Sequence, residues 1–218
     1  MIGLSSAGRA ALSGVVAALC VSAISASAQP PARAQEPCDV LITGVARGAD
    51  TTRMRTVTTG TGGRNTYVGG GVDATCSGQG NRLLADSAEH FADQGLLILY
   101  HNVRYSEPRM TMTSDRMFYY TNEERVVADG NVRGTTSSGT RFTGPQFEYF
   151  RQKPGLRDET MWIAVGRPFV RMSPTATGAA PAPGSETDSV DLTANTVTSQ
   201  NDSLIWASGA VVMERTDM

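Results

Sequence analysis

The stretch Val127-Ala128-Asp129-Gly130-Asn131-Val132 decides the fold, because its pattern of an apolar run, a turn residue and a valine recurs along the chain. We expect short strands to open after a turn residue at Gly70-Gly71-Val72, His101-Asn102-Val103, Gly130-Asn131-Val132, Gly166-Arg167-Pro168-Phe169 and Gly209-Ala210-Val211. The openings recur at steps of roughly 30 to 40 residues, a spacing at which structural repeats stack on one another. The sequence therefore predicts a stack of similar units from Val72 onward.

A second motif, a polar corner followed by apolar or aromatic residues, comes midway through each unit. It occurs at Asp86, Asp115, Pro145 and Asn195. A third short strand then closes each unit, over residues 96–100, 125–128, 161–165 and 204–207. Within the units Met110 and Met112 alternate with threonines, which is the period-two pattern of a half-buried strand.

These patterns predict an all-β protein with almost no helix. Units that cannot each bury an apolar face form a continuous core when they stack. Two architectures fit a stack of short antiparallel strands: a solenoid, or an elongated β-jellyroll with a V- or U-shaped section. We also expect an irregular first unit over 38–71, an insertion over 151–158, and a disordered insertion rich in Pro, Ala, Gly and Thr near 173–189.

The amino terminus has the pattern of a targeting segment. Arg9 precedes an apolar stretch over 10–24, and Ala26-Ser27-Ala28 offers a cleavage site, so residues 1–28 are predicted to be a signal peptide for export to the periplasm. A retained membrane anchor is the alternative, although the stretch of about 15 apolar residues is shorter than the roughly 20 that span a bilayer. Residues 29–37 would then be a linker and 38–218 a single domain.

Two cysteines remain once the signal peptide, which contains Cys20, has been removed. Cys38 and Cys76 form an even pair in an oxidising compartment, which predicts a disulfide. Such a bond would stabilise the fold by roughly 4 kcal/mol through restriction of the unfolded chain. A reactive or metal-binding thiol pair is the alternative, but the pair lacks C-x-x-C spacing and a nearby histidine.

The composition argues against several functional classes. The 19 basic and 21 acidic residues give a formal charge of −2, which is not the balance of a nucleic-acid-binding protein. The two histidines, His90 and His101, stand in no spacing typical of a metal site or a catalytic triad. Glu123-Glu124 is interpreted as a solvated hairpin tip. We therefore expect no enzymatic activity, no cofactor and no metal.

The ordered recurrence of these motifs resembles the OstA-like family. The best match is Leu83–Val132, which contains Leu84-Ala85-Asp86-Ser87-Ala88-Glu89 and Val127-Ala128-Asp129-Gly130-Asn131-Val132, and looser matches extend over roughly residues 68–214. The family includes LptA, the periplasmic bridge for lipopolysaccharide transport, and the amino-terminal domain of LptD. His101 stands where the family has glycine, Pro168-Phe169 replaces Asn-Val, and the cysteine pair is not part of the family pattern.

The resemblance implies lipid transport between the inner and outer membranes, with lipopolysaccharide or a related lipid as cargo and the transport components of both membranes as partners. Each exposed methylene of an acyl chain costs roughly 0.8 kcal/mol in water, so an apolar groove would shelter the chains. The candidate lining residues are Met110, Met112, Met117, Tyr119, Val126, Ala128 and Val132. The same residues would also suit a closed core, and the periodicity leaves both interpretations open.

Unpaired strands at the ends of the stack suggest a way to associate. Ala210–Glu214 and the strand near Val40–Val45 are candidate docking edges for head-to-tail self-association, and ordinary frayed termini are the alternative. Two other functional classes also fit an exported stack of strands. One is a β-solenoid that binds or cleaves glycans, and the other is a structural envelope protein with a fully packed core.

Overall fold

The computed structural model describes residues 38, 40–44, 52–172 and 189–216, all within one compact unit, Ala34–Met218. The predicted signal peptide and linker lie outside these residues, as does the predicted insertion up to residue 188, while Ser189 already belongs to a strand. Among the described residues, no helix has the length and hydropathy needed to cross a membrane.

The described residues form one antiparallel sheet of 14 strands and a single short 3-10 helix, η1 (Ala92–Gln94). The strands are β1 (Val40–Gly44), β2 (Arg53–Thr58), β3 (Arg64–Cys76), β4 (Arg82–Phe91), β5 (Leu96–Glu107), β6 (Met110–Tyr120), β7 (Arg125–Thr136), β8 (Arg141–Phe150), β9 (Met161–Val165), β10 (Phe169–Met172), β11 (Ser189–Thr193), β12 (Thr196–Gln200), β13 (Leu204–Ser208) and β14 (Val212–Thr216). The prediction of an all-β stack of antiparallel strands is confirmed, and the antiparallel pairing of consecutive strands gives the folded sheet rather than a solenoid.

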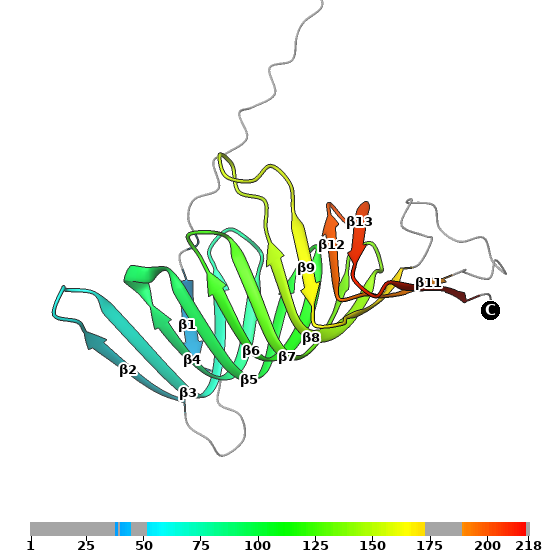
Figure 1. Cartoon of the computed structure of the whole chain (residues 1–218). Coiled ribbons are helices and arrows are strands. Elements are labelled where there is room, and N and C mark those ends of the chain that lie inside the picture. Colours follow the sequence, from blue (N-terminus) through cyan, green and yellow to red (C-terminus); the bar gives the residue numbers. More distant parts are fainter. Residues whose placement is uncertain (1–37, 39, 45–51, 173–188, 217–218) are drawn as a thin grey trace, which may run out of the picture. The chain divides into compact units, whose positions relative to one another are not determined.

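The sheet folds over into two limbs, because β3 to β8 each bend in the middle and contribute one half to each limb (Figure 1). Limb 1 contains β2, the halves of β3 to β8 within 64–69, 87–91, 96–100, 116–120, 125–129 and 146–150, and then β9, β12 and β13. Limb 2 contains β1, the halves within 72–76, 82–85, 103–107, 110–114, 132–136 and 141–144, and then β10, β11 and β14.

The recurring motifs lie at the bends between the limbs, where bulges interrupt the strand register. One set, the double corners, consists of two residues with positive φ, at Gly70-Gly71, His101-Asn102, Gly130-Asn131, Gly166-Arg167 and Gly209-Ala210. The other set, the single corners, is Asp86, Asp115, Pro145 and Asn195, and double and single corners alternate from strand to strand. The extra residue in each double corner bends the strand. The expectation that these motifs open new strands is therefore wrong for β3, β5 and β7, where they bend continuous strands, whereas β10 and β14 do begin after Gly166-Arg167 and Gly209-Ala210.

Side-chain hydrogen bonds between neighbouring corners connect the bends of adjacent strands. Asn131 donates from Nδ2 to Asp115 Oδ2 at 2.7 Å, and Asn102 donates to Asp86 in the same way at 2.7 Å. Gly130 has φ +78°, and a Cβ built there would lie 2.6 Å from Asp115 Oδ2. Glycine is therefore favoured at this corner both by the backbone conformation and by the closeness of the Asp115 side chain on the adjacent strand.

The burial of the residues after the double corners corrects one detail of the predicted repeat, namely which residue stands in the valine position of the fourth unit. Val72, Val103 and Val132 follow their double corners directly and are buried. After Gly166-Arg167 the equivalent position is Pro168, which is buried, whereas Phe169 points outward. The proline occupies the valine position because the double corner ends at Arg167 rather than at Pro168.

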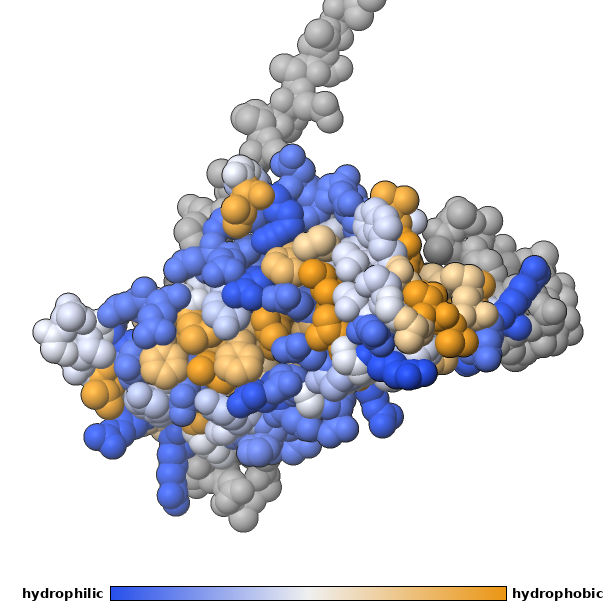
Figure 2. Space-filling view, viewed as in Figure 1, coloured by the Kyte–Doolittle hydropathy of each residue, from blue (hydrophilic) through white to orange (hydrophobic). Residues whose placement is uncertain are grey.

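Between the corners, side chains alternate between the inside and the outside of the folded sheet. In β6, Met110 and Met112 are buried and the threonines beside them are exposed, as predicted. The outer face of limb 1 is rich in half-buried apolar side chains. Figure 2, viewed as Figure 1, shows apolar side chains in a band among polar ones across the face turned to the viewer. The inner faces of both limbs meet in a single hydrophobic core.

Candidate functional site

The interior between the two limbs brings all seven predicted lining residues together. Each is at most 3% exposed. Limb 1 contributes Met117, Tyr119, Val126 and Ala128, and limb 2 contributes Met110, Met112 and Val132. They belong to one core cluster that extends from Cys38 and Val68 to Leu192 and Val197. The inner faces are thus continuously apolar along the stack.

The two walls touch in the middle of the stack. Phe142 of limb 2 stacks on Phe147 of limb 1, with ring centroids 3.9 Å apart and an angle of 3° between the rings. Trp162 lies beside both rings, with centroid distances of 6.0 Å and 5.4 Å. A ligand between the limbs at this point would have to displace one wall from the other.

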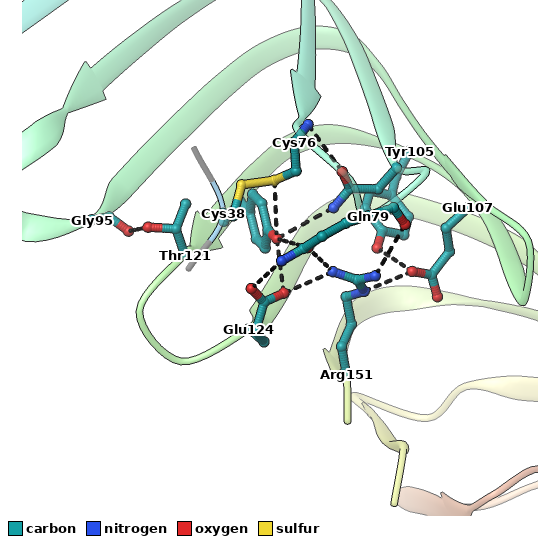
Figure 3. The surroundings of a disulfide bond; sticks show 11 residues. Cys38, Cys76, Gln79, Gly95, Tyr105, Glu107, Thr121, Glu124 and Arg151 are labelled. Carbon is teal, nitrogen blue, oxygen red and sulfur yellow. Dashed lines mark hydrogen bonds and ion pairs between the residues drawn. A yellow bond between two sulfur atoms is a disulfide. The ribbon is translucent and has the colours of Figure 1, made fainter. Parts of the chain in front are cut away.

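A buried polar cluster joins the free edges of the limbs, opposite the corners (Figure 3). Arg151, after β8 in limb 1, donates to Glu107 Oε2 of limb 2 at 2.7 Å and to Glu124 Oε2 of limb 1 at 2.7 Å. It also donates to the side-chain oxygen of Gln79, and Gln79 Nε2 donates to Glu124 Oε1 at 2.9 Å. We call these four residues the Arg151 cluster. Their contacts run from one limb to the other.

Three buried tyrosines complete the hydrogen bonding of the cluster. The Tyr149 hydroxyl donates to Glu107 Oε1 at 2.5 Å, and the Tyr105 hydroxyl donates to Oε2 of the same residue at 3.0 Å. The Tyr119 hydroxyl donates to Glu124 Oε2 at 3.0 Å. Both carboxylates therefore pair with Arg151 and accept further hydrogen bonds from phenols, and such pairing and hydrogen bonding is how proteins tolerate buried charges.

The electrostatics of the cluster follow from its burial. Burial raises the pKa of Tyr119 and of Tyr149 above the ordinary value, and the nearby carboxylates of Glu124 and Glu107, respectively, raise them further. Burial lowers the pKa of Arg151, but the surrounding tyrosines and carboxylates outweigh it and leave the pKa raised. The arrangement keeps the phenols neutral and the guanidinium charged, so it serves to hold the edges together.

The disulfide lies next to this cluster. Cys38 and Cys76 are bonded, with their Cα atoms 5.1 Å apart, and Cys76 ends β3 opposite Val40 of β1. The Tyr119 hydroxyl lies 3.4 Å from Cys76 Sγ, and Asn81 accepts a hydrogen bond from the Cys76 amide at 3.1 Å. The bond therefore ties the first strand of limb 2 to the edge where the limbs are joined.

The interior is uncovered at both ends of the stack. Met54 on β2 pairs with the inward-facing Val68 but is 52% exposed. Met213 on β14 pairs with the buried Leu192 but is 65% exposed. Each end also presents edge strands that have, among the described residues, a neighbour on one side only: β1 and β2 at one end, β13 and β14 at the other. Both predicted docking edges, now β1 and β14, are among them.

Sequence patterns do not reveal the Arg151 cluster. The interpretation of Glu123-Glu124 as a solvated tip is wrong for Glu124, whose side chain is only 5% exposed, and fits Glu123 alone, which is 52% exposed. Arg151 falls in the predicted insertion, and its partners Glu107 and Glu124 are 44 and 27 residues away along the chain. No local pattern signals such a contact, which exists only because the sheet folds over.

Two arginines of limb 1 form ion pairs outside the interior. Arg116 pairs with Asp129 on the surface, and Arg125 pairs with Glu123 and Glu148. Within the described part of the chain, no three His, Cys, Asp or Glu side chains come together in a way that would hold a metal ion.

Comparisons with known proteins give structural likenesses but no match by sequence. No protein-family model matches the chain, and no curated protein matches it. The fold is similar to that of the crystal structure of LptH, described as the LptA homologous periplasmic component of the conserved lipopolysaccharide transport device from Pseudomonas aeruginosa, with 15% sequence identity and a TM-score of 0.48. The match covers 62% of this chain and 94% of that chain.

Proposed function

We propose that this protein is an exported, periplasmic lipid-transport protein that shelters the acyl chains of a lipopolysaccharide-type lipid between its limbs on the way from the inner to the outer membrane. The observation that carries the proposal is the continuous apolar interior that is left uncovered at both ends, at Met54 and Met213. Stacked structures with a purely structural core normally cap such ends with polar residues.

The chemistry of the interior suits acyl chains. Transfer of each methylene from water to an apolar surface is favourable by about 0.8 kcal/mol, so several chains supply ample free energy to separate the walls where they touch. Methionines contribute to the interior at Met110, Met112 and Met117, and the flexible thioether adapts to ligands of varied shape. The sugar and phosphate groups would stay in water along the free edges.

The uncovered edge strands support head-to-tail association, either with a second copy or with membrane components of the same fold. Unlike ends that pair by strand addition form an open bridge rather than a closed ring. In this arrangement β14 of one copy would extend the sheet that begins with β1 of the next, and the two apolar interiors would become continuous.

Lipid extraction tests the proposed cargo. The full chain is exported in a Gram-negative host and purified without detergent, and the extracted lipids are analysed by mass spectrometry. Stoichiometric lipopolysaccharide or lipid A supports the proposal. A bound oligosaccharide, or an empty and monodisperse protein, contradicts it.

Cross-linking tests the location of the lipid. A photoreactive amino acid replaces Met213, which faces inward, or its neighbour Val212, which faces outward on the same strand. Both positions are exposed, so neither substitution disturbs the core. Cross-links to lipid from position 213 but not from position 212 are expected, and equal labelling from both would contradict an interior site.

A structural envelope role is the second candidate. The stacking of Phe142 on Phe147 favours it, because a filament needs a packed core. The extraction experiment separates the two functions, since a filament protein would be purified without lipid.

A further inference from the structure

The outer face of limb 2 differs from that of limb 1, because it is made mostly of arginine and threonine. Its outward positions on β5 to β8 include Arg104, Thr111, Thr113, Arg133 and Arg141. Arg104 and Arg133 pair with Thr113 from either side, so they stand two strands, or about 10 Å, apart. Arg141 is a diagonal neighbour of Arg133 on β8.

The arginines at the two margins of this face are neutralised. Arg82 on β4 binds Asp73 at 2.5 Å, and Arg171 on β10 binds Asp191 at 2.6 Å. Among the residues that the structure describes, the three arginines between them, Arg104, Arg133 and Arg141, have no carboxylate within ion-pair distance and no side-chain hydrogen bond. The centre of the face therefore concentrates uncompensated positive charge.

A hollow of about 480 Å³ lies at this centre and is lined by all three arginines. Ser106, Thr111, Thr135 and Thr143 also line it, together with Leu84, Tyr105, Met112 and Phe142, so guanidinium and hydroxyl groups stand among apolar side chains. Its volume falls within the range of ligand sites, roughly 300 to 1,000 Å³, and exceeds the needs of a single inorganic anion.

One acidic side chain, Asp115, lies towards the corners beside Arg104 and Arg133. A smaller neighbouring hollow of about 220 Å³, towards the corners, contains Asp115 together with Arg104 and Arg133. The Asp115 carboxylate accepts the hydrogen bond of Asn131 at 2.7 Å. Its presence at one end favours an anionic group at the opposite end, beside Arg141, Thr111 and Thr135.

We propose that this hollow is a binding site for a phosphorylated sugar, with the phosphate held by Arg133 and Arg141 and the sugar hydroxyls bonded by the threonines. Guanidinium groups bind phosphate through paired, charge-assisted hydrogen bonds, and threonine hydroxyls donate to and accept from sugar oxygens. The ligand is either a free sugar phosphate or the phosphorylated sugar headgroup of a lipid. The site lies outside the interior and is independent of the proposed transport of acyl chains.

The test uses isothermal titration of the full chain with glucose 1-phosphate, and a sedimentation assay with phosphatidylcholine vesicles that contain lipid A. We expect R133Q to weaken binding about tenfold, since it removes one charge-assisted pair of hydrogen bonds. The matched control is R82Q on the same face, whose arginine is already neutralised by Asp73, and we expect a change below about twofold there. Both substitutions are on the surface, and circular dichroism verifies the fold.

The outcomes separate the two sources of the ligand. Binding of glucose 1-phosphate that R133Q weakens and R82Q preserves supports the site with a free sugar phosphate. Vesicle binding alone, with the same dependence on Arg133, supports it with a lipid headgroup. Absence of both, or equal weakening by R82Q and R133Q, overturns the proposal and leaves the result of the lipid extraction unaffected.

Discussion

Phe142 and Phe147 belong to the same strand, β8, yet their rings stack face to face 3.9 Å apart, because the strand bends at Pro145 between them. Two residues only five positions apart thus join opposite walls of the folded sheet. Both rings are fully buried, and Trp162 packs beside them. This contact holds the limbs together in the middle of the stack.

Replacement of Phe147 by alanine is expected to lower the free energy of unfolding by about 3–5 kcal/mol, because it removes a buried ring and leaves a cavity between the walls. Urea denaturation measures the loss. Phe169 is the matched control: it lies outside and is 38% exposed, so F169A should change stability by about 0.5 kcal/mol or less. Equal effects of the two variants would show that the walls are not packed.

Replacement of Arg151 by methionine is expected to cost about 3–5 kcal/mol, since it leaves Glu107 and Glu124 buried without a cation. The exposed Arg116–Asp129 pair serves as control, and R116M should cost about 0–1 kcal/mol. The measurement is again the urea midpoint and slope. A loss for R151M no larger than that for R116M would contradict the idea that the Arg151 cluster holds the edges together.

Two glycines, Gly130 and Gly139, give a prediction that separates the free-energy cost of backbone strain from the cost of a steric contact. Gly130 and Gly139 both have positive φ, but a Cβ at Gly139 would meet nothing within 4 Å, whereas one at Gly130 would meet Asp115. G139A should therefore cost about 1–2 kcal/mol from backbone conformation alone, and G130A should cost more. Thermal unfolding of the two variants side by side measures the difference. Equal losses would mean that Asp115 moves aside without penalty.

Alkaline pH should destabilise the fold through its buried tyrosines. Burial raises the pKa of Tyr105, Tyr119 and Tyr149 in the folded chain, while in the unfolded chain each phenol ionises near pH 10. Their contribution to stability is therefore fully present below about pH 10 and is lost as the pH rises towards the folded values. Each should reduce the free energy of unfolding by about 1.4 kcal/mol per pH unit in that range.

Tyrosinate absorbance, recorded with circular dichroism, checks this expectation. Of the six tyrosines in the chain, the three buried ones should ionise only as the structure unfolds. Ionisation of all six near pH 10 with the sheet intact would contradict the burial of the cluster.

The features of the fold that repeat could be predicted from the sequence, and those that depend on folding over could not. The alternation of Met110 and Met112 with threonines correctly assigned side chains to the inside and outside of β6. The spacing of the valine and aspartate motifs correctly indicated a stack. The interpretation of the same motifs as strand openings is correct for β10 and β14 and wrong for β3, β5 and β7, because a glycine with positive φ looks the same between two strands and in a bulge within one strand.

The candidate site likewise contains residues that the sequence could predict and residues that it could not. Periodicity identified the seven interior residues, since a face of a strand is a local property. It could not identify Arg151, whose role depends on Glu107 in the other limb. Nor could it distinguish the buried Glu124 from its exposed neighbour Glu123, because the tertiary contact alone separates them.

The alternation of double and single corners has a consequence for how such a chain can change in length. A double corner with its extra residue always faces a single corner on the adjacent strand, as Gly130-Asn131 faces Asp115. Insertion of one bent strand would bring two corners of the same kind together and put the registers of the limbs out of step. The smallest tolerated increment is a complete hairpin, so lengthening or shortening in evolution or by engineering should proceed in pairs of strands.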